Sequence, residues 1–329
     1  MIITRTPFRI SFAGGGTDLR SYYHNDYGQV LSTSINKYIY VVVKKQIGVV
    51  EKKYRINWSR VESTNNIKDI QHPIVRSVLQ KYNIDFPIQI STYADIPPNT
   101  GLGSSSAFTV GLVHAIYSLL GKMVSKYQIA SEAAEIEVDI LQRNMGKQDH
   151  FVCAYGSLNI FKFFPDETVE IEPVLCKPKV IKKIEDNTLL FYTSIKRNAS
   201  IILKQQNNFP ESTRENLTRL RDLSSNLRST INKGTQLNNI GKILHKSWLI
   251  KKNISKSISS KKIDNYYNKA IKAGATGGKI LGAGGGGFIL LYVDKDKQKK
   301  VIKSLADLLL LDYKFDNSGT RITYYDNNP

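Results

Sequence analysis

The sequence has little cysteine and lacks long apolar runs. Its 329 residues include two cysteines, Cys153 and Cys176, which are too few for a disulfide framework and lack the spacing of metal ligands. We therefore expect two reduced thiols in the core of a cytosolic protein. No apolar run reaches about 18 residues, and residues 1–7 lack the charged and apolar regions of a secretory signal. These absences predict a cytoplasmic protein without a membrane partner.

Acidic residues are fewer than basic ones. The chain has 28 Asp and Glu residues against 47 Lys and Arg residues, which gives a net charge of +19. Such an excess can indicate nucleic acid, a membrane surface or a phosphorylated metabolite as partner. The lysines, however, are dispersed in pairs along the chain, and no known nucleic-acid-binding motif or fixed-period repeat occurs. We therefore give more weight to solvated surface charge and expect no nucleic acid partner.

The order of predicted strands and helices indicates an α+β chain of two domains. In the first part, the expected strands are residues 8–12, 38–43, 87–93 and 157–164, and the expected helices are residues 107–121 and 125–144. A charged, proline-containing stretch at residues 177–186 is the expected boundary, so the predicted domains are residues 1–182 and 183–329. The second part is expected to contain strands at residues 188–193 and 288–293, two or three helices within residues 211–271, and a helix at residues 295–311.

Three glycine-rich clusters, at residues 13–18, 101–106 and 282–287, mark places where the backbone must turn sharply or approach a ligand closely. The middle cluster links a predicted strand to a buried helix, so the N–H groups at the helix start would form a phosphate site. Its three serines can add hydroxyl ligands for phosphate or Mg²⁺. The middle cluster is neither a Walker A loop nor a Gly-x-Gly-x-x-Gly fingerprint. The flanking Pro97-Pro98 and the apolar helix argue against a flexible linker.

Two carboxylates after this cluster are candidates for chemistry. Glu137 falls on the apolar stripe of the second predicted helix, and a buried carboxylate needs a cation or a donor as its partner. Either a Mg²⁺ ion on nucleotide phosphates or an ion pair with Arg or Lys would satisfy that need. Asp149 lies in a polar turn, where it is either a general base or a simple turn residue. We expect the neighbouring His150 to be packed or solvated, because the Gly-x-Ser-x-Gly motif of a hydrolase triad with Ser105 is missing.

Taken in order, the three clusters resemble the motifs of the GHMP kinases, the superfamily named for galactokinase, homoserine kinase, mevalonate kinase and phosphomevalonate kinase. The similar segments are residues 7–18, 97–107 and 279–288, which span nearly the whole chain. The resemblance implies the α+β, two-domain GHMP kinase fold, in which the sheet edge of an N-terminal α/β domain faces a ferredoxin-like C-terminal domain. ATP and the substrate would bind in the cleft between the two domains.

The same resemblance implies a role for each motif residue. Ser105 and Glu137 look like the Mg²⁺ ligands of the family. Asp149 looks like the catalytic aspartate that accepts the proton of the sugar hydroxyl, while Arg9 and Mg²⁺ stabilise the transferring phosphoryl group. The residues expected to hold the ATP phosphates are Gly101, Leu102, Gly103, Ser104, Ser105 and Ser106. The residues expected to contact the substrate are Gly15, Gly16, Thr17, Asp18, Arg197, Gly284 and Gly285.

Within the superfamily, residues 9–18 are similar to the D-glycero-D-manno-heptose 7-phosphate kinases and the related fucokinases. Galactokinases carry Glu-His where this chain has Gly15-Gly16, which argues against galactose as the substrate. The resemblance therefore implies an ATP-dependent kinase that phosphorylates heptose 7-phosphate at O1, giving the 1,7-bisphosphate for nucleotide-activated heptose and surface polysaccharide. The second phosphate would need a cationic pocket, for which the candidates are Lys196, Arg197, Lys251 and Lys252.

Three other functions are left open by the sequence. The first is an L-fucose kinase or another GHMP small-molecule kinase, which would not need the cationic pocket. The second is a non-catalytic sugar sensor, although the presence of Arg9, Glu137 and Asp149 argues against it. The third is a nucleic-acid-binding protein, against which the dispersed lysines argue. A homodimer is also left open.

Overall fold

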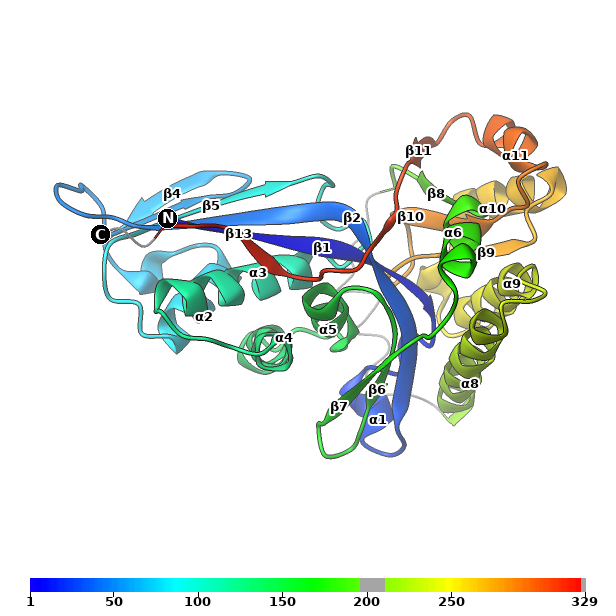
Figure 1. Cartoon of the computed structure of the whole chain (residues 1–329), viewed down its shortest axis with the longest axis horizontal. Coiled ribbons are helices and arrows are strands. Elements are labelled where there is room, and N and C mark those ends of the chain that lie inside the picture. The colour runs from blue at the N-terminus through cyan, green and yellow to red at the C-terminus, as the bar shows by residue number, and fades with distance from the viewer. Residues whose placement is uncertain (196–210, 327–329) are drawn as a thin grey trace.

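Two β-sheets, each with its own helices, lie side by side in the molecule (Figure 1). The structure is a computed structural model that describes residues 1–195 and 211–326. The two ends of the described chain meet, because Met1 and Asp326 exchange backbone hydrogen bonds beside the pair of strands that they flank. The first sheet therefore contains both the first and the last strand of the chain.

Within the described residues, the first sheet has nine strands around the 18-residue strand β2 (Gly28–Lys45), which is rich in β-branched and aromatic residues. The main order is β13-β1-β2-β5-β3-β4, while β12 and β6 also pair with β2 and β7 pairs with β6. Only the pairing of β3 with β5 is parallel among the described strands. The other strands are β1 (Ile2–Ala13), β3 (Tyr54–Asn57), β4 (Val61–Thr64), β5 (Ile88–Ala94), β6 (Leu158–Phe163), β7 (Val169–Pro173), β12 (Phe315–Asp316) and β13 (Arg321–Tyr325).

Helices cover one face of this sheet, with α3 (Ser104–Leu119) innermost (Figure 1). This helix is apolar on most of its faces, and it packs against β1 and β2 on one side and against α4 and α5 on the other. Its first residue follows the middle glycine cluster, so the sheet and the core fix the position of that loop. The other helices of this part are α2 (Pro73–Lys81), α4 (Lys126–Glu135) and α5 (Gln148–Tyr155), with a 3-10 turn at Ile67–Asp69, and the short α1 (Arg20–Tyr23), which lies beside β6 and β7 in Figure 1.

The second sheet has the antiparallel order β11-β8-β10-β9. Numbered along the chain, this is the order four, one, three, two of a ferredoxin-like unit, with helices after its first and third strands. The α+β fold with a ferredoxin-like second part is therefore confirmed. The strands are β8 (Thr188–Tyr192), β9 (Gly277–Ile280), β10 (Phe288–Tyr292) and β11 (Leu309–Leu311), and the helices are α6 (Pro178–Asp186), α8 (Glu211–Lys233), α9 (Asn239–Lys252), α10 (Lys261–Ala273) and α11 (Gln298–Ser304), with a 3-10 turn at Lys256–Ile258.

Two helices predicted from the sequence are shorter than expected. The helix predicted at residues 125–144 ends as an α-helix at Glu135, continues as a π-helical turn over Ile136–Ile140, and stops before Gln142, whose φ is +49°. The helix predicted at residues 295–311 ends at Ser304, and Leu309–Leu311 form β11 because they pair with β8. In the second case, pairing with a distant strand overrides the local helical pattern.

The last strands return to the first sheet, which the sequence did not predict. β12 pairs with β2, and β13 pairs with β1. The expected domain division between residues 182 and 183 falls inside helix α6. The assignment of residues 1–182 and 183–329 to two domains stays a prediction.

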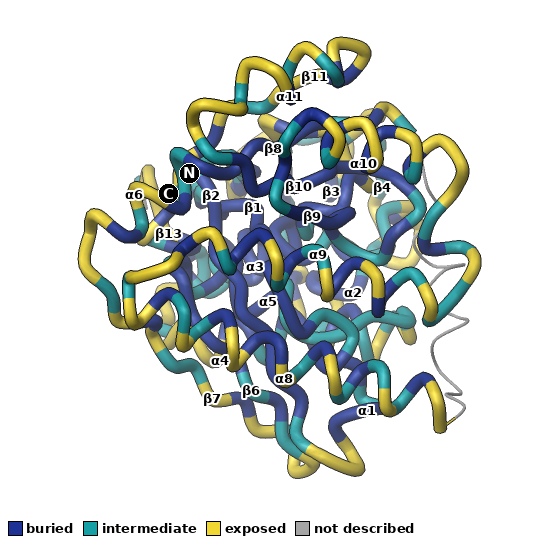
Figure 2. Tube along the Cα trace, turned by 90° about the vertical axis from the view of Figure 1, so that its right-hand side faces the viewer, coloured by how far each residue is buried: buried dark blue, intermediate teal, exposed yellow. Residues whose placement is uncertain are grey.

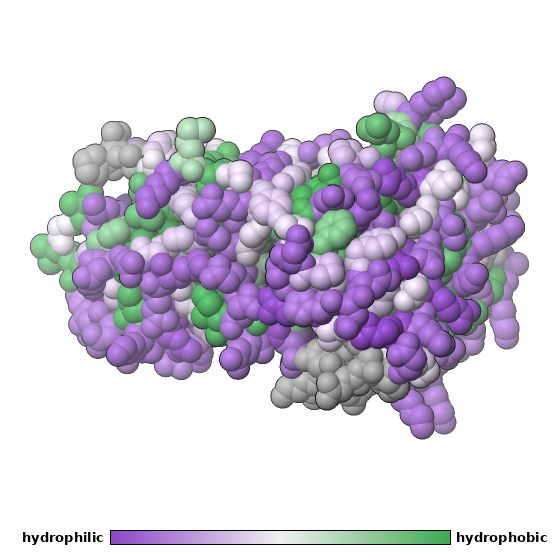
Figure 3. Space-filling view, turned by 90° about the horizontal axis from the view of Figure 1, so that it is seen from below, coloured by the Kyte–Doolittle hydropathy of each residue, from purple (hydrophilic) through white to green (hydrophobic). Residues whose placement is uncertain are grey.

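The largest cluster of buried hydrophobic residues includes residues of both sheets, and a second cluster lies within the second part of the fold; Figure 2 shows the buried residues in the interior. Cys153 is buried and Cys176 is partly exposed, and neither forms a disulfide within the described residues. The face seen in Figure 3 is mostly hydrophilic, with apolar residues in small, separate groups. None of the described helices combines the length and the apolar character needed to cross a lipid bilayer.

Candidate active site

A cleft of about 1340 Å³ lies between the two parts of the fold. Its lining includes parts of all three glycine clusters, and it receives residues from β1, from the start of α3 and from the turn before α5. Leu217 of α8, Lys251 of α9 and Lys279 of β9 close it from the side of the second sheet. The fold therefore gathers distant motifs into one concave site, which is the usual form of a small-molecule site.

The middle glycine cluster forms the loop that starts α3. Gly103 is the N-cap residue and has a left-handed conformation with φ of +76°. A Cβ atom there would lie 3.1 Å from Arg9 Cγ and 3.3 Å from Asp149 Oδ2, so the position has little room for a side chain. Because the helix starts at Ser104, the free N–H groups of its first turn point toward the cleft side of the loop. This geometry suits a phosphate group.

The third glycine cluster packs against this loop at Gly287, where a Cβ atom would lie 2.1 Å from the carbonyl oxygen of Thr100. Gly282 and Ala283 of the same cluster line the cleft. Gly284 and Gly285 contact Ile258 instead: a Cβ on Gly284 would approach it within 2.9 Å, and the N–H of Gly285 donates to its carbonyl. A contact of Gly284 or Gly285 with substrate stays a prediction.

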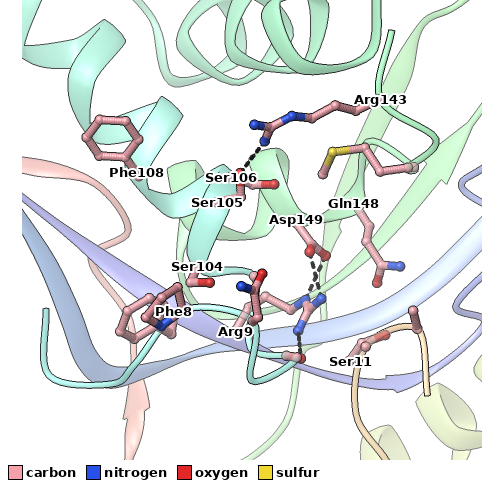
Figure 4. A pocket seen from close by; sticks show the side chains of 18 of the residues that line it. Phe8, Arg9, Ser11, Ser104, Ser105, Ser106, Phe108, Arg143, Gln148 and Asp149 are labelled. Carbon is pink, nitrogen blue, oxygen red and sulfur yellow. Dashed lines mark hydrogen bonds and ion pairs between the residues drawn. The ribbon is translucent and has the colours of Figure 1, made fainter. Parts of the chain in front are cut away.

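Arg9 and Asp149 form a two-pronged ion pair beside the phosphate loop (Figure 4). Arg9 Nε and Nη2 each donate to one carboxylate oxygen of Asp149 at 2.7 Å. The third guanidinium nitrogen of Arg9 donates to the carbonyl oxygen of Gly101. The pair therefore connects β1, the loop and the start of α5, and it fixes the direction of the Asp149 carboxylate.

Asp18 lies near Asp149 and is held by the residues just before Asp149 in the chain. Its carboxylate accepts hydrogen bonds from the backbone N–H of Gly16 at 3.0 Å and from the backbone and side chain of Gln148 at 3.2 and 2.9 Å. A Cβ at Gly146 would lie 1.9 Å from Asp18 Oδ2, so this glycine leaves room for the carboxylate. Burial, followed by the nearby charge of Asp149, raises the pKa of Asp18 above its ordinary value. Gly146 and Gln148 were not among the site residues predicted from the sequence.

The other predicted residues of the first cluster lie beside Asp18. Gly15 and Gly16 line the cleft. Thr17 is buried, and its hydroxyl donates to the carbonyl oxygens of Gly14 and Gln29. Thr17 therefore supports the loop from behind. Arg197 and Lys196 lie outside the described residues.

Glu137 is fully buried at the π-helical turn, as its place on the apolar stripe predicted. Ser105, Thr109, Arg143 and His150 surround its carboxylate, with hydrogen bonds of 3.0 Å from both Thr109 and His150. Burial raises the pKa of this carboxyl, but the hydrogen bond with His150, the charge of Arg143 and the hydrogen bond from Ser105 outweigh it and hold the pKa at about 2. Glu137 is therefore ionised at neutral pH.

The sequence left open whether Mg²⁺ or an ion pair satisfies Glu137. The structure shows an ion pair with Arg143, whose guanidinium also donates to Ser105 Oγ at 2.7 Å (Figure 4). The same two oxygen groups, one ionised carboxylate and one hydroxyl, lie together at the phosphate loop. Mg²⁺ prefers few protein oxygens plus phosphate oxygens, so the residues present fit such an ion. Of the two expected states of His150, packed or solvated, the structure shows the packed one, with no exposed surface.

An aromatic wall, made of Trp58, His72 and Phe108, lines the cleft beyond the phosphate loop. The rings of Trp58 and His72 are 4.7 Å apart, and those of His72 and Phe108 are 5.0 Å apart. Burial lowers the pKa of His72 to about 4, so this ring is neutral at physiological pH. Trp58 Nε1 is buried without a hydrogen-bond partner in the described part of the chain. This wall was not predicted from the sequence, because its three residues are far apart in the chain.

Comparison with known proteins identifies the family of this chain. The GHMP kinases N-terminal domain matches residues 68–157, and the GHMP kinases C-terminal domain matches residues 225–309. The chain is 30% identical to D-glycero-alpha-D-manno-heptose 7-phosphate kinase from Campylobacter jejuni, over 97% of this chain and 98% of that protein.

Two solved structures have the same fold. A D-glycero-D-manno-heptose 1-phosphate kinase from Bacteroides thetaiotaomicron matches with a TM-score of 0.81 and 22% identity, covering 99% of this chain and all of that one. The crystal structure of a putative sugar kinase from Campylobacter jejuni matches with a TM-score of 0.77 and 28% identity, covering 98% of this chain and 97% of that one. The protein is a member of the GHMP kinase family. It is therefore a phosphotransferase.

Proposed function

We propose that this protein is an ATP- and Mg²⁺-dependent sugar kinase that phosphorylates D-glycero-D-manno-heptose 7-phosphate at O1. The observation that carries the proposal is the carboxylate of Asp149, which Arg9 orients between the phosphate loop and Asp18. A base in this place can reach a hydroxyl of a sugar held by Asp18. The 30% identity to the C. jejuni heptose 7-phosphate kinase supports the choice of sugar.

Each residue of the site has a separate role in the proposed phosphoryl transfer. Bound ATP would supply the phosphoryl group, and Mg²⁺ on Ser105 and Glu137 would neutralise charge on its phosphates. The loop from Gly101 to Ser106 binds the phosphates through backbone N–H groups and hydroxyls. Asp18 accepts hydrogen bonds from ring hydroxyls and orients the sugar. Asp149 accepts the proton of the attacking hydroxyl, and Arg9 stabilises charge on the transferring group.

The lack of a side chain at Gly15 leaves room in the cleft for a bulky substrate. A Cβ atom on Gly15 would lie 3.6 Å from Ser11 Oγ and 3.7 Å from Gln148 Nε2, which are ordinary contacts. Its backbone φ is not among the left-handed values of the chain, so the backbone does not demand glycine here. A longer side chain would extend into the cleft. The space beside Asp18 is thus available to the extra carbon and phosphate of a heptose phosphate.

The substrate is tested by measuring coupled ADP release with ATP and Mg²⁺. Heptose 7-phosphate, fucose, galactose, mannose, mevalonate and homoserine are compared at equal concentrations. We expect the highest kcat/KM for heptose 7-phosphate, with the new phosphate on O1 by phosphorus NMR of the product. Preferred turnover of fucose would replace the heptose assignment by the fucokinase alternative, and turnover of mevalonate or homoserine alone would remove the sugar assignment.

The aromatic wall gives a separate prediction for the nucleotide. We assign it to the adenine base, because stacking on an aromatic ring contributes about 1–3 kcal/mol per base. Trp58→Ala is therefore expected to raise the KM for ATP roughly tenfold while changing the KM for the sugar little. Tyr93→Ala is the matched control, since this exposed ring lies on β5 outside the cleft lining. An unchanged KM for ATP in the Trp58 variant would contradict the assignment of this wall to the adenine base.

A further inference from the structure

One lysine of the cleft is buried without a countercharge. Lys279 lies on β9, whose four residues are all buried, and only 3% of its surface is exposed. Its Nζ donates to the carbonyl oxygen of Phe12 at 3.1 Å, and it forms no ion pair with a carboxylate of the described residues. Burial, then the charges of Lys251 and Arg9, lower its pKa well below the ordinary value. A buried ammonium group normally requires a paired anion.

Two further polar groups of the cleft lie near this ammonium group. Lys251 of α9 is 9% exposed, and its Nζ donates to the carbonyl of Gly282. Ser11, next to Phe12 on β1, is 5% exposed, and its Oγ is buried without a hydrogen-bond partner among the described residues. Ser11 Oγ also faces the space above Gly15. Two lysine amino groups and an unused hydroxyl are donors that suit a phosphate group, and the negative charge of a bound phosphate would favour the charged form of Lys279.

The position of this group of donors favours the sugar side of the cleft. Lys279 and Lys251 belong to the second sheet and its helix, whereas the phosphate loop and α3 belong to the first part of the fold. From Phe12, the carbonyl partner of Lys279, the chain continues directly into Gly15 and Asp18. The nucleotide phosphates already have the start of α3 and the Ser105–Glu137 pair.

We propose that Lys279, Lys251 and Ser11 bind the phosphate group that the sugar substrate already carries before the reaction. This inference rests on the proposed function, because it assumes that the site acts on a sugar phosphate. It gives a location to the cationic pocket that the sequence predicted, and it adds Lys279, which was not among the candidates, as the buried member. Lys252, another candidate from the sequence, pairs with Asp264 at 2.9 Å and does not line the cleft.

The first test compares a phosphorylated and an unphosphorylated sugar. Lys279→Met and Lys251→Met variants are assayed with heptose 7-phosphate and with unphosphorylated heptose, and Lys252→Met is the matched control. Each lysine variant should lower kcat/KM for the phosphate roughly 10- to 100-fold, since a hydrogen bond to a charged group is lost. The value for unphosphorylated heptose should stay near that of wild type. An equal loss for both sugars in both variants would overturn the proposal, because it would indicate a nucleotide or structural role.

A second readout separates this inference from the proposed function. Inorganic phosphate is titrated calorimetrically into the protein saturated with Mg²⁺ and the non-hydrolysable analogue AMP-PNP, which fills the nucleotide phosphate positions. Phosphate should bind to wild type and to Lys252→Met, but not to Lys279→Met or Lys251→Met. If heptose 7-phosphate is not turned over but this pattern holds, the heptose assignment fails and the phosphate site stands. If turnover occurs and the variants bind phosphate like wild type, the phosphate site falls and the kinase assignment stands. No binding to wild type would also overturn the site.

Discussion

Replacing Asp149 by Asn is expected to lower kcat roughly 10²- to 10⁴-fold, the range that a positioned general base contributes. The amide has nearly the same shape as the carboxylate, but its single oxygen can accept only one of the two hydrogen bonds from Arg9, and it cannot take a proton from the sugar hydroxyl. The KM for ATP should change little, because Asp149 is not part of the phosphate loop. Coupled ADP release over a range of ATP and sugar concentrations measures both constants.

The matched control is Asp139→Asn, the same exchange on the π-helical turn. Asp139 is a half-exposed residue that pairs with Arg20 and does not line the cleft. Its replacement should leave both constants near wild type. If the Asp149 variant kept the wild-type kcat while the protein remained folded, Asp149 would be a positioning group for Arg9, and another base would have to be sought in the cleft.

The local parts of the fold could be predicted from the sequence, whereas the long-range pairings could not. The apolar helix α3 and the alternating strand β5 have patterns that a single segment reveals. The strand β11 and the return of β13 to β1 depend on partners more than a hundred residues away. The short apolar run Leu309–Leu311 suits a helix or a strand equally well, so only its pairing with β8 decides.

In the site, too, local features could be predicted from the sequence and long-range contacts could not. Glu137 could be found because its place on an apolar stripe is a local property, and its burial is confirmed. Arg143, its ion-pair partner, could not, since the π-helical turn shifts the helical register just before it. The burial of Lys279 could not be predicted either, because alternate side chains of a strand face opposite sides and lysine is usually exposed, most of all on an edge strand such as β9. Its proximity to Lys251 and Ser11 comes only from the packing of the two sheets.

The exchange Glu137→Gln should affect metal use and stability together. Loss of the carboxylate should raise the Mg²⁺ concentration that gives half-maximal activity by roughly 10- to 100-fold, as for other groups that support a metal site. Binding of Mn²⁺ in the presence of AMP-PNP, followed by electron paramagnetic resonance, gives a readout independent of turnover. An unchanged Mg²⁺ requirement would mean that Glu137 is not a metal ligand and that its role is the structural ion pair, the alternative that the sequence left open.

The pH dependence of stability gives a second signature of the same residue. The pKa of Glu137 is about 2 in the folded protein against 4.5 as its ordinary value, which corresponds to about 3 kcal/mol of stability. Because the folded pKa is lowered, this contribution is present above about pH 4.5 and is lost as the pH falls toward 2. Urea unfolding should therefore show Glu137→Gln less stable than wild type at pH 7, with a difference that narrows below about pH 4.5.

Glu132→Gln separates the two effects of Glu137→Gln. Glu132 lies on α4, away from the cleft, and its carboxylate accepts hydrogen bonds from Tyr82, Tyr117 and Gln128. Burial raises the pKa of this carboxyl, but these hydrogen bonds outweigh it and lower the pKa overall. The control variant should therefore also lose stability at pH 7, with a difference that narrows in acid, yet it should keep the wild-type Mg²⁺ requirement. A raised Mg²⁺ requirement in both variants would mean that loss of folding, and not loss of a ligand, explains the effect at Glu137.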